Sequence, residues 1–130
     1  MEAKELRIGN YLKTDRECQD DYVEVVEIYN ENYFCTCSAG LNYQKEHVKP
    51  IPLTEEWLVR FGFEIDFYGG QGNVTYYAKK GKFKLYSIED DKSYQYDWTK
   101  NMFVMIKNVH QLQNLYYSLT QKELIWKKYI

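Results

Sequence analysis

The sequence has 130 residues, with 17 Lys and Arg against 19 Asp and Glu, and therefore a formal net charge of −2. This length predicts one domain over residues 1–130 with a hydrophobic core of its own. The charge disfavours a general nucleic-acid binder, because phosphate contacts need a surplus of cations. The longest apolar run, Met102–Ile106, is far too short to span a bilayer, and the charged residues 1–7 lack the apolar region of a secretory signal. We therefore expect a cytoplasmic protein with no membrane partner.

The first 49 residues are predicted to form a β module. Residues 6–12, 22–29 and 33–37 are short segments rich in β-branched and aromatic residues, and a Gly-Asn break falls within the first of them. Strands at this spacing predict a small, strongly bent sheet or an SH3-like barrel. Pro50 and Pro52 force an extended chain, which separates the module, residues 1–49, from the remainder, residues 50–130.

A short helix is predicted directly after the prolines. Thr54 is a good N-cap residue, and Glu55 and Glu56 fall in the first turn, where the helix dipole favours acids. Gly62 is suited to the position just beyond the helix end. The apolar face of this helix consists of Trp57, Leu58 and Phe61.

Residues 63–107 are predicted to form an antiparallel sheet. Polar or glycine-rich turns at 69–73, 80–81 and 89–92 separate segments that alternate apolar and polar residues or are rich in tyrosine. The last segment, Met102–Ile106, is apolar on both faces, which is typical of a central strand.

The C-terminus is predicted to be helical. An apolar face at helical spacing is expected to pack against the sheet; it consists of Leu112, Leu115, Tyr116 and Leu119. Thr120–Glu123 has the form of a capping box and predicts a second short helix that contains Leu124, Ile125 and Trp126. The predicted fold class is therefore α+β, with an N-terminal β module, a short helix, an antiparallel sheet and C-terminal amphipathic helices.

No motif in the sequence predicts catalysis or a bound metal. Cys35 and Cys37 lie one residue apart, and with Cys18 and His47 they do not match the spacing of structural zinc sites. His110 begins the C-terminal helix, where packing or capping is the expected role. The chain has no nucleophile elbow and no phosphate-binding loop. The sequence therefore predicts a protein that is not an enzyme and that uses no cofactor or metal.

The most distinctive compositional feature is tyrosine, with 14 among 130 residues. Six tyrosines fall in residues 64–100, near the only dense lysine cluster, Lys79–Lys84. Aromatic rings beside lysines offer stacking surfaces and cations to a nucleotide or a single strand. A solvated hairpin tip, with tyrosines covering a small core, is the favoured alternative, and both interpretations remain open. The candidate ligand-binding residues are Tyr76, Lys82, Lys84, Tyr94, Tyr96 and Trp98.

Three blocks of the sequence resemble a family of small, mostly uncharacterised phage and prophage proteins from Bacteroidetes. They are ELRIGN at residues 5–10, PIPLTEEWL at 50–58 followed by FGF at 61–63, and HQLQNLYYSLT at 110–120. The blocks stand in order and span nearly the whole chain, whereas residues 13–45 and 64–100 correspond to variable regions. The resemblance implies a phage origin and a bacterial host cytoplasm, and it supplies no catalytic residues.

These observations lead to an expected function of a non-enzymatic phage accessory protein that binds a host target. Small phage proteins without catalytic motifs act by sequestration, so the expected partner is a nucleotide immune signal or a host defence protein. The alternatives are a small hydrolase of a nucleotide signal and a nucleic-acid-binding protein. A homo-oligomer is compatible with the sequence.

Overall fold

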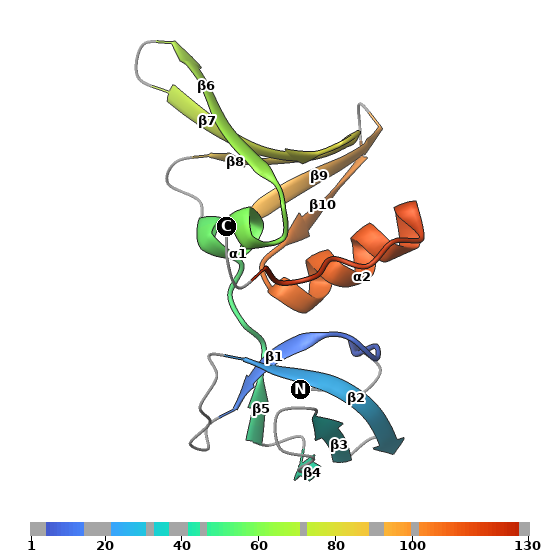
Figure 1. The fold of residues 1–130 in the computed structure, drawn as a ribbon. Coiled ribbons are helices and arrows are strands. Elements are labelled where there is room, and N and C mark those ends of the chain that lie inside the picture. Colours follow the sequence, from blue (N-terminus) through green and yellow to red (C-terminus); the bar gives the residue numbers. More distant parts are fainter. Residues whose placement is uncertain are drawn as a thin grey trace. The chain divides into compact units, whose positions relative to one another are not determined.

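The computed structural model describes residues 5–14, 22–30, 33–36, 42–44, 47–70, 73–88, 93–99 and 102–127. The fold is mixed, with two antiparallel sheets and two helices in the described residues, as the predicted α+β class requires (Figure 1). The chain divides into two compact units, Met1–Pro52 with Asn108–Glu123, and Leu53–Lys107 with Leu124–Ile130. No helix in the described part of the chain is both long enough and apolar enough to cross a bilayer.

The first unit is built on the sheet β4-β3-β2-β1-β5. Its strands are β1 (Tyr11–Thr14), β2 (Val23–Asn30), β3 (Tyr33–Thr36), β4 (Asn42–Gln44) and β5 (Val48–Lys49). Strand β1 pairs antiparallel with both β2 and β5, so the end of the module returns to its beginning. The core of this sheet consists of Leu6, Leu12, Val23, Val25 and Val48.

The first strand is shorter than predicted. A strand was expected over residues 6–12, but β1 begins only at Tyr11. Gly9 has a φ of 99°, a conformation that glycine adopts readily and other residues do not. The backbone N–H of Asn10 donates to the carbonyl of Arg7 at 3.0 Å, which closes a turn before the strand.

Helix α2 (Val109–Thr120) belongs to the first unit and contacts β1. We expected its apolar face to pack against the sheet of residues 63–107, but that sheet lies in the other unit. Leu112 and Tyr116 are buried as predicted, whereas Leu119 is exposed. Because the apolar pattern shows which face is buried and not which partner buries it, the sequence left the partner undetermined.

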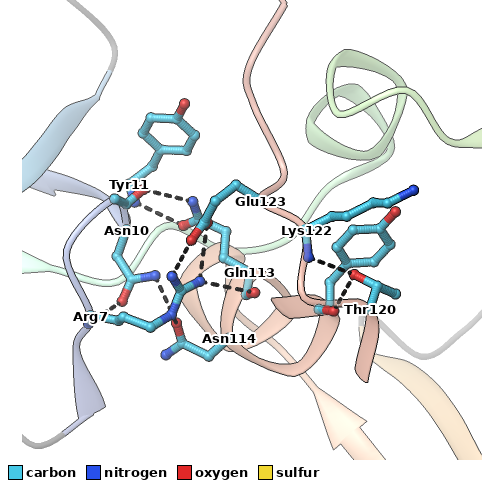
Figure 2. Close-up of polar contacts among 10 residues, drawn as sticks. Arg7, Asn10, Tyr11, Gln113, Asn114, Thr120, Lys122 and Glu123 are labelled. Carbon is cyan, nitrogen blue, oxygen red and sulfur yellow. Dashed lines mark hydrogen bonds and ion pairs between the residues drawn. The ribbon is translucent and has the colours of Figure 1, made fainter. Parts of the chain in front are cut away.

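Polar side chains join α2 to the turn before β1 (Figure 2). Gln113 is fully buried; its Oε1 accepts from the backbone N–H of Tyr11 at 2.8 Å, and its Nε2 donates to the carbonyl of Gly9 at 2.9 Å. Asn114 Oδ1 accepts from Asn10 Nδ2 at 2.8 Å and from Arg7 Nε at 3.2 Å. The blocks at residues 5–10 and 110–120 are therefore in direct contact.

The predicted second C-terminal helix does not form. Helix α2 ends at Thr120; its C-cap residue Gln121 has a left-handed φ of 61°, and residues 122–127 are not helical. The expected capping box needs the Glu123 carboxylate at the Thr120 backbone, but this carboxylate forms an ion pair with the Arg7 guanidinium (Figure 2). The prediction was wrong because a tertiary contact uses the residue that would have capped the helix.

The second unit contains the predicted antiparallel sheet, in the order β10-β9-β8-β7-β6. Its strands are β6 (Glu64–Gly70), β7 (Asn73–Lys80), β8 (Phe83–Ile88), β9 (Tyr94–Thr99) and β10 (Met102–Ile106). The strands follow one another in chain order, so β10 lies at an edge of the sheet (Figure 1). The prediction of a central strand at Met102–Ile106 was therefore wrong.

Helix α1 (Glu55–Arg60) begins and ends as predicted. Thr54 Oγ1 accepts from the backbone N–H of Trp57 at 3.4 Å, and Gly62 follows the helix with a φ of 92°. The N–H groups of Gly62 and Phe63 donate to the carbonyls of Val59 and Leu58, which is the Schellman arrangement. The buried residues of this unit include Trp57, Leu58, Phe61, Phe63, Ala78, Phe83, Leu85 and Ile106.

Candidate ligand-binding site

The two faces of the second sheet carry different side chains. We call one the core face, because Ala78 and Leu85 are buried on it. Ala78 pairs with Leu85, Tyr76 pairs with Ser87, and Tyr86 pairs with Gln95. Since paired residues share a face and neighbours along a strand alternate, the core face also carries Tyr76, Ser87, Tyr94 and Tyr96. The opposite face carries Asp66, Tyr77, Lys84, Tyr86, Gln95 and Asp97.

A pocket of about 190 Å³ opens on the core face beside the first turn of α1. Its lining consists of Glu55, Ile65, Tyr76, Ala78, Ser87 and Tyr94, together with Tyr77, whose side-chain contacts with Asp66 and Lys84 lie on the opposite face. Tyr76 comes from β7 and Tyr94 from β9, and Ser87 lies on β8, between these two strands. The structure thus brings two of the six candidate residues to one hollow.

The electrostatics of this pocket favour a ligand that donates hydrogen bonds. Burial and the nearby Glu55 carboxylate both raise the pKa of Tyr94 above its ordinary value, so its hydroxyl stays neutral at physiological pH. Glu55 contributes a carboxylate to the described lining, which contains no lysine or arginine. A carboxylate accepts hydrogen bonds and disfavours a neighbouring phosphate.

The two candidate lysines lie elsewhere. Lys84 points to the opposite face, where its Nζ is 4.5 Å from the centre of the Tyr77 ring and 5.5 Å from that of Tyr86. Lys82 is exposed in the turn between β7 and β8. The structure therefore does not join the candidate lysines and tyrosines on one face.

The remaining two candidate residues are Tyr96 and Trp98, both on β9. Tyr96 lies on the core face and stacks on Phe83, with ring centres 4.8 Å apart and an interplanar angle of 18°. This contact fits the interpretation in which tyrosine covers a small core. Trp98 belongs to β9, and its side chain lies outside the described residues.

On the opposite face, Tyr77 is held by an acid. Its hydroxyl donates to Asp66 Oδ2 at 3.1 Å, and this hydrogen bond, with burial and the charge of Asp66, raises the pKa of Tyr77. Asp66 and Lys84 thus both contact one tyrosine, and their opposite charges partly balance. Among the described residues of this face, the lysines therefore give no excess of positive charge over the acids that could bind a phosphate.

A second hollow of about 280 Å³ lies at the C-terminal end of α1, lined by Gly62, Glu64, Lys79, Lys80 and Gly81. Lys80 Nζ donates to the Phe61 carbonyl at 2.6 Å, and Lys79 Nζ lies 3.8 Å from Glu64 Oε2. Burial, followed by the nearby Lys127 charge, lowers the pKa of Lys80. These two amines already have partners, so the hollow favours an anion less than its lysines suggest.

Sequence reasoning missed Glu55 and Ser87 as pocket residues. Glu55 was assigned to the helix dipole, a role that it also satisfies in the first turn of α1. The alternation of β8 places Ser87 on the core face, but only the pairing of β8 with β7 places it next to Tyr76. Local pattern gives the face of a residue, and strand pairing gives its neighbours.

No metal centre is visible in the described part of the chain, where no three His, Cys, Asp or Glu side chains gather. Cys18 and Cys37 of the candidate cluster lie outside the described residues, as does the side chain of Cys35.

Comparisons with known proteins add no relative. No family model, no curated protein and no solved structure matches this chain. The resemblance to phage and prophage proteins therefore stays a prediction.

Proposed function

We propose that this chain is a non-enzymatic binding protein whose core-face pocket takes the base of a small nucleotide. The observation that carries the proposal is the grouping of Tyr76 and Tyr94 with Glu55 and Ser87 around one pocket. Tyrosine rings stack on any base, and the carboxylate accepts the N–H groups on a base edge.

The size and charge of the pocket limit how such a ligand sits. Its volume of about 190 Å³ is below the ~300–1,000 Å³ of pockets that enclose whole ligands. The pocket therefore suits one base or nucleoside, and the phosphates remain outside, away from Glu55. A pocket that recognises the ligand by the hydrogen-bonding edge of its base needs no lysine or arginine, because the phosphates do not enter it.

The resemblance to phage proteins suggests a biological role for nucleotide binding. A phage protein that holds a nucleotide immune signal in the host cytoplasm lowers the free concentration of that signal without chemistry. Such a role needs no catalytic group, and the described pocket lining offers neither histidine nor cysteine. The strand order of the first unit supports the SH3-like form of the N-terminal module.

Calorimetric titration with nucleosides, mononucleotides and cyclic dinucleotides tests the proposal. Stacking contributes ~1–3 kcal/mol per base, so we expect Tyr94→Ala to weaken binding about fivefold to 150-fold. Glu55→Gln exchanges an acceptor oxygen for a donor and is expected to alter the preference among bases. Lys84→Ala, on the opposite face, is the matched control and is expected to leave the affinity within about twofold.

The fate of the ligand separates binding from hydrolysis. After incubation and heat denaturation, the proposal expects the nucleotide to be recovered intact by chromatography. Altered nucleotide would establish the hydrolase alternative. The absence of binding to all three ligand classes, or an equal loss in Lys84→Ala and Tyr94→Ala, would refute the pocket assignment.

A further inference from the structure

Strand β10 is an apolar edge. Met102, Phe103, Val104 and Met105 have exposed fractions of 63%, 58%, 36% and 37%, and Ile106 alone is buried. The strand contains no charged residue and no proline, the two devices that most often protect an edge from pairing. Its side chains are apolar on both faces of the sheet, so each face of an added strand would meet apolar neighbours.

The backbone of β10 also has polar groups directed away from the sheet. The N–H of Leu53 donates to the carbonyl of Lys107 at 2.9 Å, so the polar groups of Lys107 face away from β9. These groups alternate along an antiparallel strand. Met105 and Phe103 therefore also direct their N–H and C=O groups to the open side, where no described residue pairs with them.

We propose that β10 pairs antiparallel with β10 of a second copy of this chain, which makes a two-fold symmetric dimer with one continuous sheet. The register that uses the whole strand places Val104 on the two-fold axis. It pairs Phe103 of each copy with Met105 of the other through their outward backbone groups. An isologous contact requires a surface that complements itself, and a neutral strand that is apolar on both faces meets this requirement without opposing like charges.

The apolar area that β10 exposes limits how strongly two copies can associate. An aromatic side chain such as Phe103 buries ~150–250 Å², and on that scale the four exposed fractions correspond to a patch on the order of 400 Å². Two copies then bury about 800 Å² together, below the ~1,200 Å² of a stable interface. Main-chain hydrogen bonds add to the contact, as in other strand additions. We therefore expect a weak dimer in rapid exchange, with a dissociation constant in the micromolar to submillimolar range.

Sedimentation velocity over a wide concentration range tests this proposal. The wild-type chain is expected to shift from monomer to dimer as its concentration rises. Phe103→Lys places a charge in the contact and is expected to weaken dimerisation at least tenfold. The new amine would face Asp97 of β9, the residue paired with Phe103, so the sheet is expected to remain folded. Ile125→Lys, at an apolar residue that is 66% exposed outside the sheets, is the matched control.

A mixing experiment tests the register. Met105→Glu is expected to be monomeric, as is Phe103→Lys, but an equimolar mixture is expected to dimerise because the new lysine faces the new glutamate across the interface. Circular dichroism and thermal melting check that both variants are folded.

Several results would overturn the proposal. A wild-type chain that stays monomeric at submillimolar concentration, or dimers of equal strength in wild type and Phe103→Lys, would each do so. Binding of β10 to a different protein with no self-association would also overturn it. Nucleotide titration of Phe103→Lys is independent, because Phe103 does not line the pocket.

Discussion

Gln113 is a polar side chain with no exposed surface, and both ends of its amide are bonded to backbone. It meets Tyr11 at the first position of β1 and Gly9 in the turn before it. These two hydrogen bonds fix the rotation of α2 about its own axis, because a small rotation of the helix would break both of them. Gln113 and the buried apolar residues Leu112 and Tyr116 therefore together define the face of α2 that is turned inward.

Gln113→Leu tests this role. The change leaves the Tyr11 N–H and the Gly9 carbonyl buried without partners, and each costs ~1–3 kcal/mol. We expect the free energy of unfolding to fall by about 2–4 kcal/mol in urea denaturation. Ser118→Ala, at an exposed position on the same helix, is expected to change it by less than about 0.5 kcal/mol. A Gln113→Leu variant as stable as the wild type would contradict the prediction.

His110 is buried near the start of α2, and its Nδ1 has no hydrogen-bond partner among the described residues. Burial lowers its pKa, and Glu5, whose carboxylate lies 4.0 Å from Nε2, partly opposes this shift. This burial fits a packing role, while Asn108 and Gln111 form the cap, with the Asn108 N–H donating to Gln111 Oε1 at 3.1 Å.

The lowered pKa of His110 makes stability depend on pH. The unfolded chain binds a proton near pH 6.5, and the folded chain binds it only at lower pH. As the pH falls from 7.5 through 6.5 toward the folded pKa, the unfolded state gains a proton first, so the free energy of unfolding decreases. Below the folded pKa this contribution is flat. Urea denaturation from about pH 5 to pH 8 is expected to show a shallower slope for His110→Gln than for the wild type, and equal slopes would contradict the assignment.

At the scale of elements, helix α1 shows how local signals define a boundary. Thr54 and Gly62 mark its two ends in the sequence, and the hydrogen bonds of the structure lie where these residues predict. The strands of the second sheet likewise form where the sequence alternates apolar and polar residues. Strand β10 is the exception, because an apolar segment at a sheet edge has the same sequence pattern as one at the centre.

Gly62→Ala tests the end of α1. Its φ of 92° is strained for alanine, and the new Cβ would lie 2.8 Å from Lys80 Nζ, which can move. Left-handed backbone costs ~1–2 kcal/mol in a residue with a Cβ, so the free energy of unfolding is expected to fall by about that amount. Gly81→Ala is the comparison: its φ is 61° and nothing lies within 4 Å of the new Cβ. Thermal melting that ranks Gly81→Ala as the more damaging change would contradict this account.

At the scale of the whole molecule, the chain crosses between its two compact units more than once. Residues 1–52 and 108–123 form one unit, and residues 53–107 and 124–130 form the other. The first crossing follows Pro52, within the extended proline segment at which the sequence predicts the end of the β module, because proline restricts the backbone locally. The later crossings, after Lys107 and after Glu123, have no comparable proline signal in the sequence. Side chains on both sides of the segment 108–123 instead contact distant residues: Gln113 bonds to Gly9 and Tyr11, and Glu123 pairs with Arg7.

The sequence by itself determined the α+β class, the two ends of α1, most strand positions and the concentration of tyrosine in residues 64–100. These properties depend on neighbours within a few residues, which the chain displays directly. Only the tertiary structure decided that Tyr76 and Tyr94 share a pocket with Glu55, that Lys84 lies on the opposite face, and that β10 is an edge. Strand order and pairing decide such contacts, and they join residues whose separation along the chain carries no local signal.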